Sequence, residues 1–255
     1  MYVREGSEAL LEEGWPREIQ SRTWALLSPE VFDAAVETRS PQGIAATWTI
    51  PDAEPKPLDG CMLVMENLQD PGNVGTLIRT AEAFGCGVMA TPATANEWNP
   101  KVVRASAGSV LRLPMRRAPL PALYEQLRAA GFRIFAAVAG MEGPSRMAMP
   151  HGVVLGRRDD VAGTAHEVDQ GMPYDPEGQA ASLAPDTDFA PPCAIVVGNE
   201  GEGLTAEAVA GADEQVSIPS HVESLNAGVA GSLLMYEQMR QVTLRHWARQ
   251  QGLRP

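Results

Sequence analysis

The sequence has few of the features that mark membrane or secreted proteins. No apolar run approaches the roughly 18 to 20 residues that a transmembrane helix needs, and acidic side chains stand near the N-terminus where a signal peptide has its basic region. Only three cysteines occur in 255 residues, and no CxxC spacing is present, which argues against a disulfide framework or a cysteine zinc site. We therefore expect a cytoplasmic protein without a bound metal, whose Cys61, Cys86 and Cys193 are reduced core thiols.

Basic residues are also scarce, because 20 Lys and Arg face 32 Asp and Glu. A net charge of −12 argues at first against a nucleic-acid partner, since phosphates are neutralised by Lys and Arg. The excess lies in two segments, however: residues 1–55 carry 10 acidic and 4 basic side chains, and residues 141–190 carry 9 and 3. Between them a locally basic block is a candidate surface for a polyanion, although a solvated charged face is an equal alternative. The block contains Lys101, Arg104, Arg112, Arg116 and Arg117.

Apolar runs that are typical of buried strands alternate with helical patterns. The strands are expected at residues 61–65, 87–91, 133–139 and 193–197, and the helices at 73–84, 120–130 and 224–247. Such alternation predicts an α/β fold with a mostly parallel sheet covered by helices on both faces.

Two regions break this alternation. Residues 141–190 are rich in Gly, Pro, Met and Asp without a sustained period, which indicates an acidic insertion forming a mobile surface loop. Residues 1–55 are too few for an ordinary independent core, so this piece either packs against the rest of the chain or is the remnant of something larger. The main domain is then expected to span residues 56–255.

The first polar cluster follows the first predicted strand of the main domain and reads ENLQDPGNVG over residues 66–75. Asn73 stands where a helix N-cap is wanted. Helical periodicity places Arg79 opposite the apolar stripe of that helix, so spacing alone predicts only a solvated arginine.

The second cluster, GNEGEGL at residues 198–204, follows the last buried strand pattern. Its glycines are spaced GxxGxG and stand late in the chain, which disfavours an NAD-type site. Two carboxylates make a poor phosphate cradle, so a ligand with a cationic centre would suit the loop better than a phosphate.

The third cluster, IPSHVESLN at residues 218–226, opens the last helix, with Ser224 as a candidate N-cap. His221 and Ser224 invite a hydrolase interpretation, but no GxSxG elbow is present. Gly228 and Gly231 would let the helix approach other backbone closely.

Together the three clusters resemble the SpoU (TrmH) family of the SPOUT RNA methyltransferases. The first motif is matched by Asn67, residues 70–73, Gly75 and residues 79–81, the second by residues 198–204, and the third by Ile218, Pro219 and residues 224–226. The stretch PKVVRASAG at residues 100–108 resembles a further family segment. The resemblance covers about residues 56–140 and 191–248 and leaves the acidic insertion out.

The resemblance implies an α/β domain with a C-terminal trefoil knot, a homodimer, and S-adenosylmethionine (SAM) as methyl donor. The product would be a 2′-O-methylated ribose, in ribosomal RNA more readily than in transfer RNA. It implies three sets of site residues. Catalytic positions would be Arg79, Asn73, Glu200, Ser224 and Asn226; cofactor contacts would be Gly198, Ile218, Leu225, Glu200, Gly203 and Pro219; RNA contacts would be Arg79, Lys101, Arg104, Ser106, Arg112 and Arg116.

Some features depart from the family pattern. Four residues separate Pro219 from Ser224 where many relatives have six, and the N-terminal segment has about half the usual length of a ribosomal-protein-like RNA-binding domain. Either the sequence begins inside a longer chain, or the enzyme finds RNA with less protein. The alternatives are a non-catalytic SAM- or RNA-binding protein, a SPOUT enzyme that methylates a base nitrogen, and last a nucleotide-dependent dehydrogenase.

Overall fold

The computed structural model describes residues 1–11, 24–36, 38, 40–50, 57–139, 181–220, 222 and 224–251. The chain divides into two compact units, Met1–Asp52 and Ala53–Pro255. Among the described residues no helix is long and apolar enough to cross a membrane.

The first unit is a small three-stranded sheet with order β2-β1-β3. Strand β1 (Tyr2–Arg4) pairs in parallel with β2 (Ala25–Leu27) and antiparallel with β3 (Ile44–Ala45). The 3-10 helix η1 (Glu8–Leu11) follows β1, and helix α2 (Pro29–Ala35) follows β2. Val3 and Phe32 are fully buried and form the centre of this unit.

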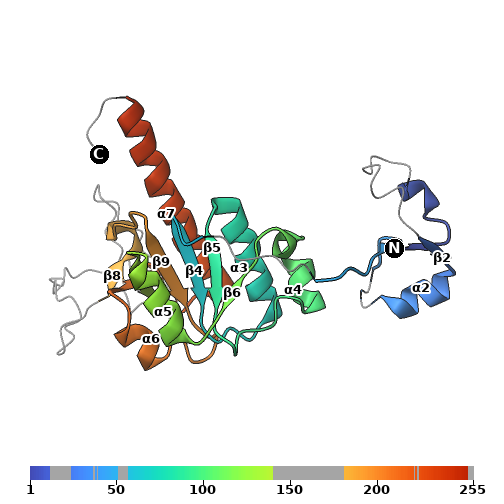
Figure 1. Cartoon of the computed structure of the whole chain (residues 1–255), viewed down its shortest axis with the longest axis horizontal. Helices are drawn as coiled ribbons and strands as arrows, with labels where there is room; N and C mark the ends of the chain where they lie inside the picture. Colours follow the sequence, from blue (N-terminus) through green and yellow to red (C-terminus); the bar gives the residue numbers. More distant parts are fainter. Residues whose placement is uncertain are drawn as a thin grey trace, which may run out of the picture. The chain divides into compact units, whose positions relative to one another are not determined.

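The second unit is a parallel α/β sheet (Figure 1). Its strand order is β6-β5-β4-β9-β7-β10-β8, and every strand pair is parallel. The predicted α/β class with a mostly parallel sheet is thereby confirmed. The strands are β4 (Cys61–Met65), β5 (Gly87–Ala90), β6 (Arg116–Arg117), β7 (Arg133–Ala137), β8 (Ser182–Leu183), β9 (Cys193–Val197) and β10 (Glu214–Ser217). The helices are α3 (Pro71–Phe84), α4 (Pro100–Ala105), η2 (Ser109–Leu111), α5 (Leu120–Ala129), η3 (Ala184–Asp186), α6 (Ala206–Ala210) and α7 (Ala227–Gln250).

Alternate residues of the central strands enter two different cores. On β4, Leu63 packs in the core that includes α3 and α7, whereas Met62 and Val64 pack in the core that includes α5 and α6. This follows from the two-residue repeat of a strand, and burial on both faces explains why β4 and β9 consist of apolar residues alone. The sheet therefore lies between two helical layers.

The structure changes the expected boundary of the acidic insertion. Residues 141–180 lie outside the described residues, but residues 181–190 belong to the folded unit. Strand β8 pairs with β10 at the sheet edge, and Phe189 is fully buried with its ring centroid 4.9 Å from that of Phe135. Because this stretch has no regular pattern of apolar residues, the sequence did not indicate that Phe189 belongs to the core.

Both predicted helix caps are wrong by two or three residues. Asp70, not Asn73, caps α3, because its side chain accepts a hydrogen bond from the backbone N–H of Asn73 at 2.8 Å. Asn226, not Ser224, caps α7 by accepting from the N–H of Val229 at 3.1 Å. In both segments several residues have side chains that can cap a helix, and three-dimensional packing selects among them.

The three cysteines are buried and free, as predicted. Cys61 and Cys193 are register partners on β4 and β9. Hydrogen bonding to the thiols of Cys193 and Cys86, together with burial, raises the pKa of Cys61 well above its ordinary value.

Candidate active site

A pocket of about 280 Å³ lies at the carboxyl ends of β7, β9 and β10. In parallel sheets the loops at this edge form the usual ligand site. Four segments line it: the end of β7 with residues 138 and 139, the loop that follows β9, the end of β10 with the loop after it, and the first turns of α7. Of the predicted cofactor contacts, the lining includes Gly198, Glu200, Gly203, Ile218 and Leu225, but not Pro219. Of the predicted catalytic residues it includes Glu200 and Ser224, but not Asn73, Arg79 or Asn226.

The loop after β9 is folded tightly against itself. Asn199 and Gly203 exchange both backbone hydrogen bonds, at 3.0 and 2.9 Å. A Cβ atom on Gly198 would come within 2.4 Å of the backbone of Gly203, so a side chain does not fit there. The Asn199 carboxamide accepts from the N–H of Gly201 at 2.8 Å and donates to the carbonyl of Asn67 at 3.0 Å. The second motif is thus held in one shape and tied to the first.

Glu200 makes the second connection between these motifs. One of its carboxylate oxygens accepts from Asn73 Nδ2 at 2.9 Å and from the backbone N–H of Asp70 at 3.3 Å. Its other oxygen accepts from the N–H of Gln69 at 3.4 Å. The structure therefore brings together two of the predicted catalytic residues.

The surroundings of Glu200 favour its charged form. Partial burial acts to raise the pKa of Glu200, but the hydrogen bonds from Asn73 and from the backbone N–H groups of Gln69 and Asp70 outweigh that effect and lower it. The carboxylate is therefore ionised at neutral pH and places one negative charge at the pocket.

Asn226 lies beside Asn73 at the start of α7. A Cβ on Gly228 would lie 2.9 Å from Asn73 Oδ1 and 3.1 Å from Asn226 Oδ1, so both amide oxygens flank this glycine. Gly231 also allows α7 to lie close to α3, since a Cβ there would lie 2.6 Å from Leu77 Cδ2. The expected close packing of α7 through its glycines is confirmed.

Arg79 projects from α3 on the exposed side of the helix, as its periodicity predicts. Within the described part of the chain its guanidinium has no hydrogen-bond or ion-pair partner. The side chain is therefore available to a ligand that approaches from solvent.

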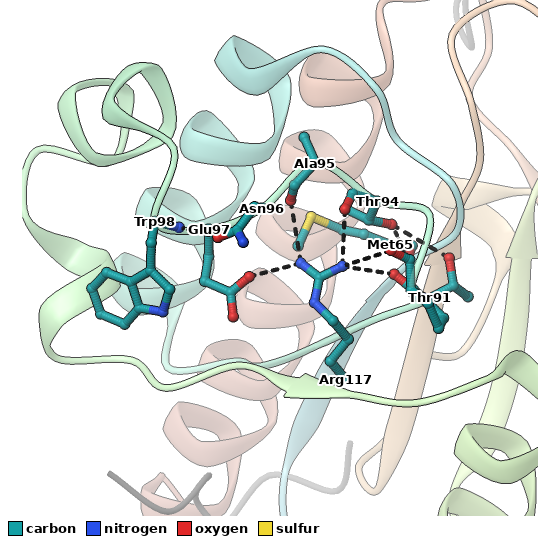
Figure 2. Close-up of polar contacts among 9 residues, drawn as sticks. Met65, Thr91, Thr94, Ala95, Asn96, Glu97, Trp98 and Arg117 are labelled. Atoms are coloured by element: carbon teal, nitrogen blue, oxygen red, sulfur yellow. Dashed lines mark hydrogen bonds and ion pairs between the residues drawn. The ribbon is translucent and has the colours of Figure 1, made fainter. Parts of the chain in front are cut away.

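The basic side chains of the block are of two kinds: some bind other residues of the protein, and others have no partner among the described residues. Figure 2 shows the guanidinium of Arg117 inside the loop that follows β5, where it donates to the carbonyls of Thr91, Thr94 and Ala95 at 2.9, 2.9 and 3.2 Å and pairs with Glu97 at 2.7 Å. Arg117 therefore holds a loop together and does not form part of a free basic surface.

The remaining members of the block, and Ser106, differ in exposure. Arg112 pairs with Glu82 at 2.6 Å, and Arg116 is half-buried beside Gln126. Ser106 is fully buried and its hydroxyl donates to the carbonyl of Val103, which removes it as a surface contact to RNA. Lys101 and Arg104 are exposed, and their side chains have no partner within the described residues.

Sequence reasoning missed Glu66 and Thr205. Glu66 is only 2% exposed, and its carboxylate accepts hydrogen bonds from both the N–H and the hydroxyl of Thr205. An acidic residue directly after an all-apolar buried strand is the signal that could have drawn attention to Glu66.

Comparison with known proteins identifies the family. The sequence profile described as "SpoU rRNA Methylase family" matches residues 60–160 and 158–236, which is more than half of the chain. The chain belongs to this family. The resemblance found in the motifs is confirmed, and the match also runs through the segment 141–190 that the motifs had left out.

Two relatives share about a third of their residues with this SpoU-family chain. The 23S rRNA (guanosine(2553)-2′-O)-methyltransferase RlmP of Bacillus subtilis is 32% identical over 214 residues, covering 83% of this chain and 70% of its own. A tRNA/rRNA methyltransferase of Synechocystis is 33% identical over 222 residues, covering 85% of this chain and 67% of its own.

Solved structures agree on the fold. An RNA 2′-O ribose methyltransferase superimposes with a TM-score of 0.62 at 25% identity, over 95% of this chain and 80% of the other. The SpoU methyltransferase AviRb of Streptomyces viridochromogenes, solved with AdoMet, gives a TM-score of 0.58 at 22% identity, over 95% and 82%.

Proposed function

We propose that the chain is a SAM-dependent methyltransferase that modifies the 2′-hydroxyl of a ribose in RNA, with ribosomal RNA as the substrate. The observation that carries the proposal is the pocket at the carboxyl ends of β7, β9 and β10, where two motif loops of an RNA methylase family meet around an ionised carboxylate. Family membership and the 2′-O activity named for RlmP support the same reaction.

The chemistry of the pocket fits SAM better than a nucleotide phosphate. Among the described residues that line the pocket none is Lys or Arg, whereas Glu200 and Glu202 both belong to the lining and supply negative charge that would favour a cationic sulfonium. Gly198, Gly203, Ile218 and Leu225 would hold SAM through backbone groups and apolar contacts. When bound, SAM supplies an electrophilic methyl group.

Arg79 is the residue that we assign to the reacting ribose. A guanidinium loses its proton with difficulty, so the main contribution of Arg79 would be to stabilise the negative charge that develops on the 2′-oxygen. In the transfer the new O–CH3 bond would form as the S–CH3 bond of SAM breaks and S-adenosylhomocysteine leaves. The 2′-hydroxyl proton would be relayed through Ser224, Asn226 or a water molecule to solvent, its final acceptor. Asn73 and Glu200 position the helix from which Arg79 projects, because their hydrogen bond fixes the start of α3.

Lys101 and Arg104 are assigned to the RNA backbone. Both side chains are exposed and unpaired in the described structure, unlike Arg117 and Arg112. Phosphate contacts by such cations supply the sequence-independent part of RNA affinity.

The further proposals from the family are a knotted C-terminal part and a homodimer. Strand β9 lies between β4 and β7, which both precede it in the sequence, and this order is consistent with a knotted path. Helix α7 also carries a row of large apolar side chains that are 44 to 54% exposed, and a second copy of the chain would cover it. The row consists of Val229, Leu233, Tyr236, Leu244 and Trp247.

Light scattering tests the dimer. We expect wild-type protein at twice the chain mass and Leu233→Glu at the chain mass, because the new charge would be buried in the interface. Arg249→Gln makes the same change in charge on the opposite side of α7, where Arg249 is exposed, and should remain dimeric. A Leu233→Glu variant that stays dimeric would place the interface elsewhere.

Methyl transfer tests the reaction and the substrate together. Labelled SAM is incubated with total ribosomal RNA and, separately, total transfer RNA from an unmethylated source, followed by nuclease digestion and nucleoside mass analysis. We expect a 2′-O-methylnucleoside in the ribosomal pool. A methylated base, label in the transfer RNA pool alone, or SAM binding without any transfer would each replace this proposal with one of its alternatives.

A further inference from the structure

Glu66 contacts both ends of the glycine-rich loop that forms one wall of the pocket. Its backbone N–H donates to the carbonyl of Val197, directly before the loop, at 2.8 Å. Its side chain accepts from the N–H of Thr205, directly after the loop, at 2.9 Å and from the Thr205 hydroxyl at 2.6 Å. Glu66, directly after β4, therefore fixes how far apart the two ends of the loop 198–204 lie.

The contact with Glu66 uses both hydrogen-bond donors of Thr205. The Thr205 hydroxyl donates its proton to Glu66 Oε1 and accepts from the N–H of Ala208 at 3.1 Å, while the Thr205 N–H donates to Glu66 Oε2. Each carboxylate oxygen accepts one bond. Glu66 is 2% exposed, whereas Thr205 is exposed, so a Glu66 oxygen that loses its partner is the group that would be left unmatched at a cost.

The mechanism has no other use for this buried acid. Among the described residues Glu66 has no Lys or Arg partner, and it does not line the pocket. Together with burial, the Glu66 carboxylate raises the pKa of the neighbouring Tyr124, but Tyr124 bonds α6 at the carbonyl of Ala208 and not the loop.

We propose that Glu66, acting through Thr205, is a positioning residue that holds the loop 198–204 in the shape that binds SAM. This inference rests on the proposed function. It adds a second carboxylate contact to that of Glu200: Glu200 ties the loop outward to α3, and Glu66 joins the two ends of the loop to each other.

The primary test is Glu66→Gln. The amide keeps the size of the side chain but offers one acceptor oxygen where two are needed, and its NH2 group faces a Thr205 donor. We expect the Kd for SAM, measured by calorimetry, to rise at least about fivefold, equal to about 1 kcal/mol. The KM for SAM should rise in parallel. At saturating SAM the bound cofactor would hold the loop, and with it Glu200, in place, so kcat and the KM for total ribosomal RNA should stay within about twofold.

Variants of Thr205 and Tyr124 separate positioning from general loss of stability. Thr205→Ser keeps both donors and the cap of α6 and should bind SAM like wild type. Thr205→Val removes the hydroxyl bond to Glu66 and also the cap of α6, so the Kd for SAM should rise at least as much as in Glu66→Gln. The double variant Glu66→Gln/Thr205→Val should be no weaker than the weaker single variant, because both changes remove the same contact. Tyr124→Phe removes another buried hydrogen bond to α6 and should leave SAM affinity unchanged. Circular dichroism establishes that each variant is folded at the measuring temperature.

The possible failures are distinguishable. If wild-type protein binds no SAM, the proposed function is wrong. If wild type binds SAM and Glu66→Gln binds equally well, or if Tyr124→Phe weakens binding as much as Glu66→Gln, only the role of Glu66 is overturned. Additive losses in the double variant would show that Glu66 does not act through Thr205.

Discussion

Asn73 and Glu200 stand 127 positions apart in the sequence, yet Asn73 Nδ2 donates to Glu200 Oε1 at 2.9 Å. The bond joins the start of α3 to the loop after β9, so the two motifs form one site. Glu200→Gln should lower kcat/KM about tenfold or more, because the Gln NH2 group would face donors on residues 69–73. Glu207→Gln makes the same charge change on the exposed side of α6 and should leave kcat/KM unchanged. Equal effects of the two variants would contradict a specific role for Glu200.

Arg79→Ala should abolish methyl transfer and leave SAM binding nearly intact. The side chain is exposed on α3 and does not line the pocket, so its removal takes a group from the reacting ribose and not from the cofactor. Single-turnover methyl transfer and SAM calorimetry measure the two effects separately. Equal loss of both would make Arg79 part of the cofactor site instead.

Arg117→Ala should act on stability. It removes the donor for four loop carbonyls and leaves Glu97 unpaired, so we expect the free energy of unfolding to fall by about 2 to 4 kcal/mol. Urea denaturation measures this. Arg104→Ala is the matched control: it should change stability by less than about 0.5 kcal/mol but weaken RNA binding and reduce its salt dependence. The reverse pattern would restore Arg117 to the RNA surface.

The pKa of Glu200 provides a pH test. Because it is lowered in the folded protein, the carboxylate stabilises the fold at neutral pH, and this contribution is lost as the pH falls through the folded-state pKa. Asn73→Ala removes a donor to the carboxylate and should raise the pKa of Glu200, which carbon NMR of the labelled carboxyl group can follow. An unchanged pKa in Asn73→Ala would assign the shift to the backbone N–H groups alone.

Much of the central fold was predictable because it depends on local patterns. The buried strands β4 and β9 are uninterrupted apolar runs, and α3 has a clear apolar stripe. The capping residue of α3 was also available in the sequence: Pro71 occupies the first helical turn, where proline is favoured, so the residue before it is the natural cap.

The roles of Arg117, Ser106 and Glu66 could not be predicted in this way. Arg117 binds carbonyls 22 to 26 positions earlier in the chain, and Glu66 binds Thr205 across 139 positions. The local sequence shows that Arg117 is basic and that Ser106 stands in a segment resembling the family. It does not show which side chains the tertiary structure buries. The same limitation applied to Phe189, whose core position depends on a strand pairing at the far edge of the sheet.

The buried cysteines provide a natural probe for transient opening of the central sheet. Cys61, Cys86 and Cys193 are at most 4% exposed, and a thiol reagent reacts with the thiolate, which is scarce while the pKa of Cys61 is raised. Labelling of Cys61 therefore has to wait until β4 becomes exposed to solvent. The rate at which Cys61 in native protein takes up such a reagent, followed by peptide mass analysis, would report how often the centre of the sheet opens, without any engineered probe.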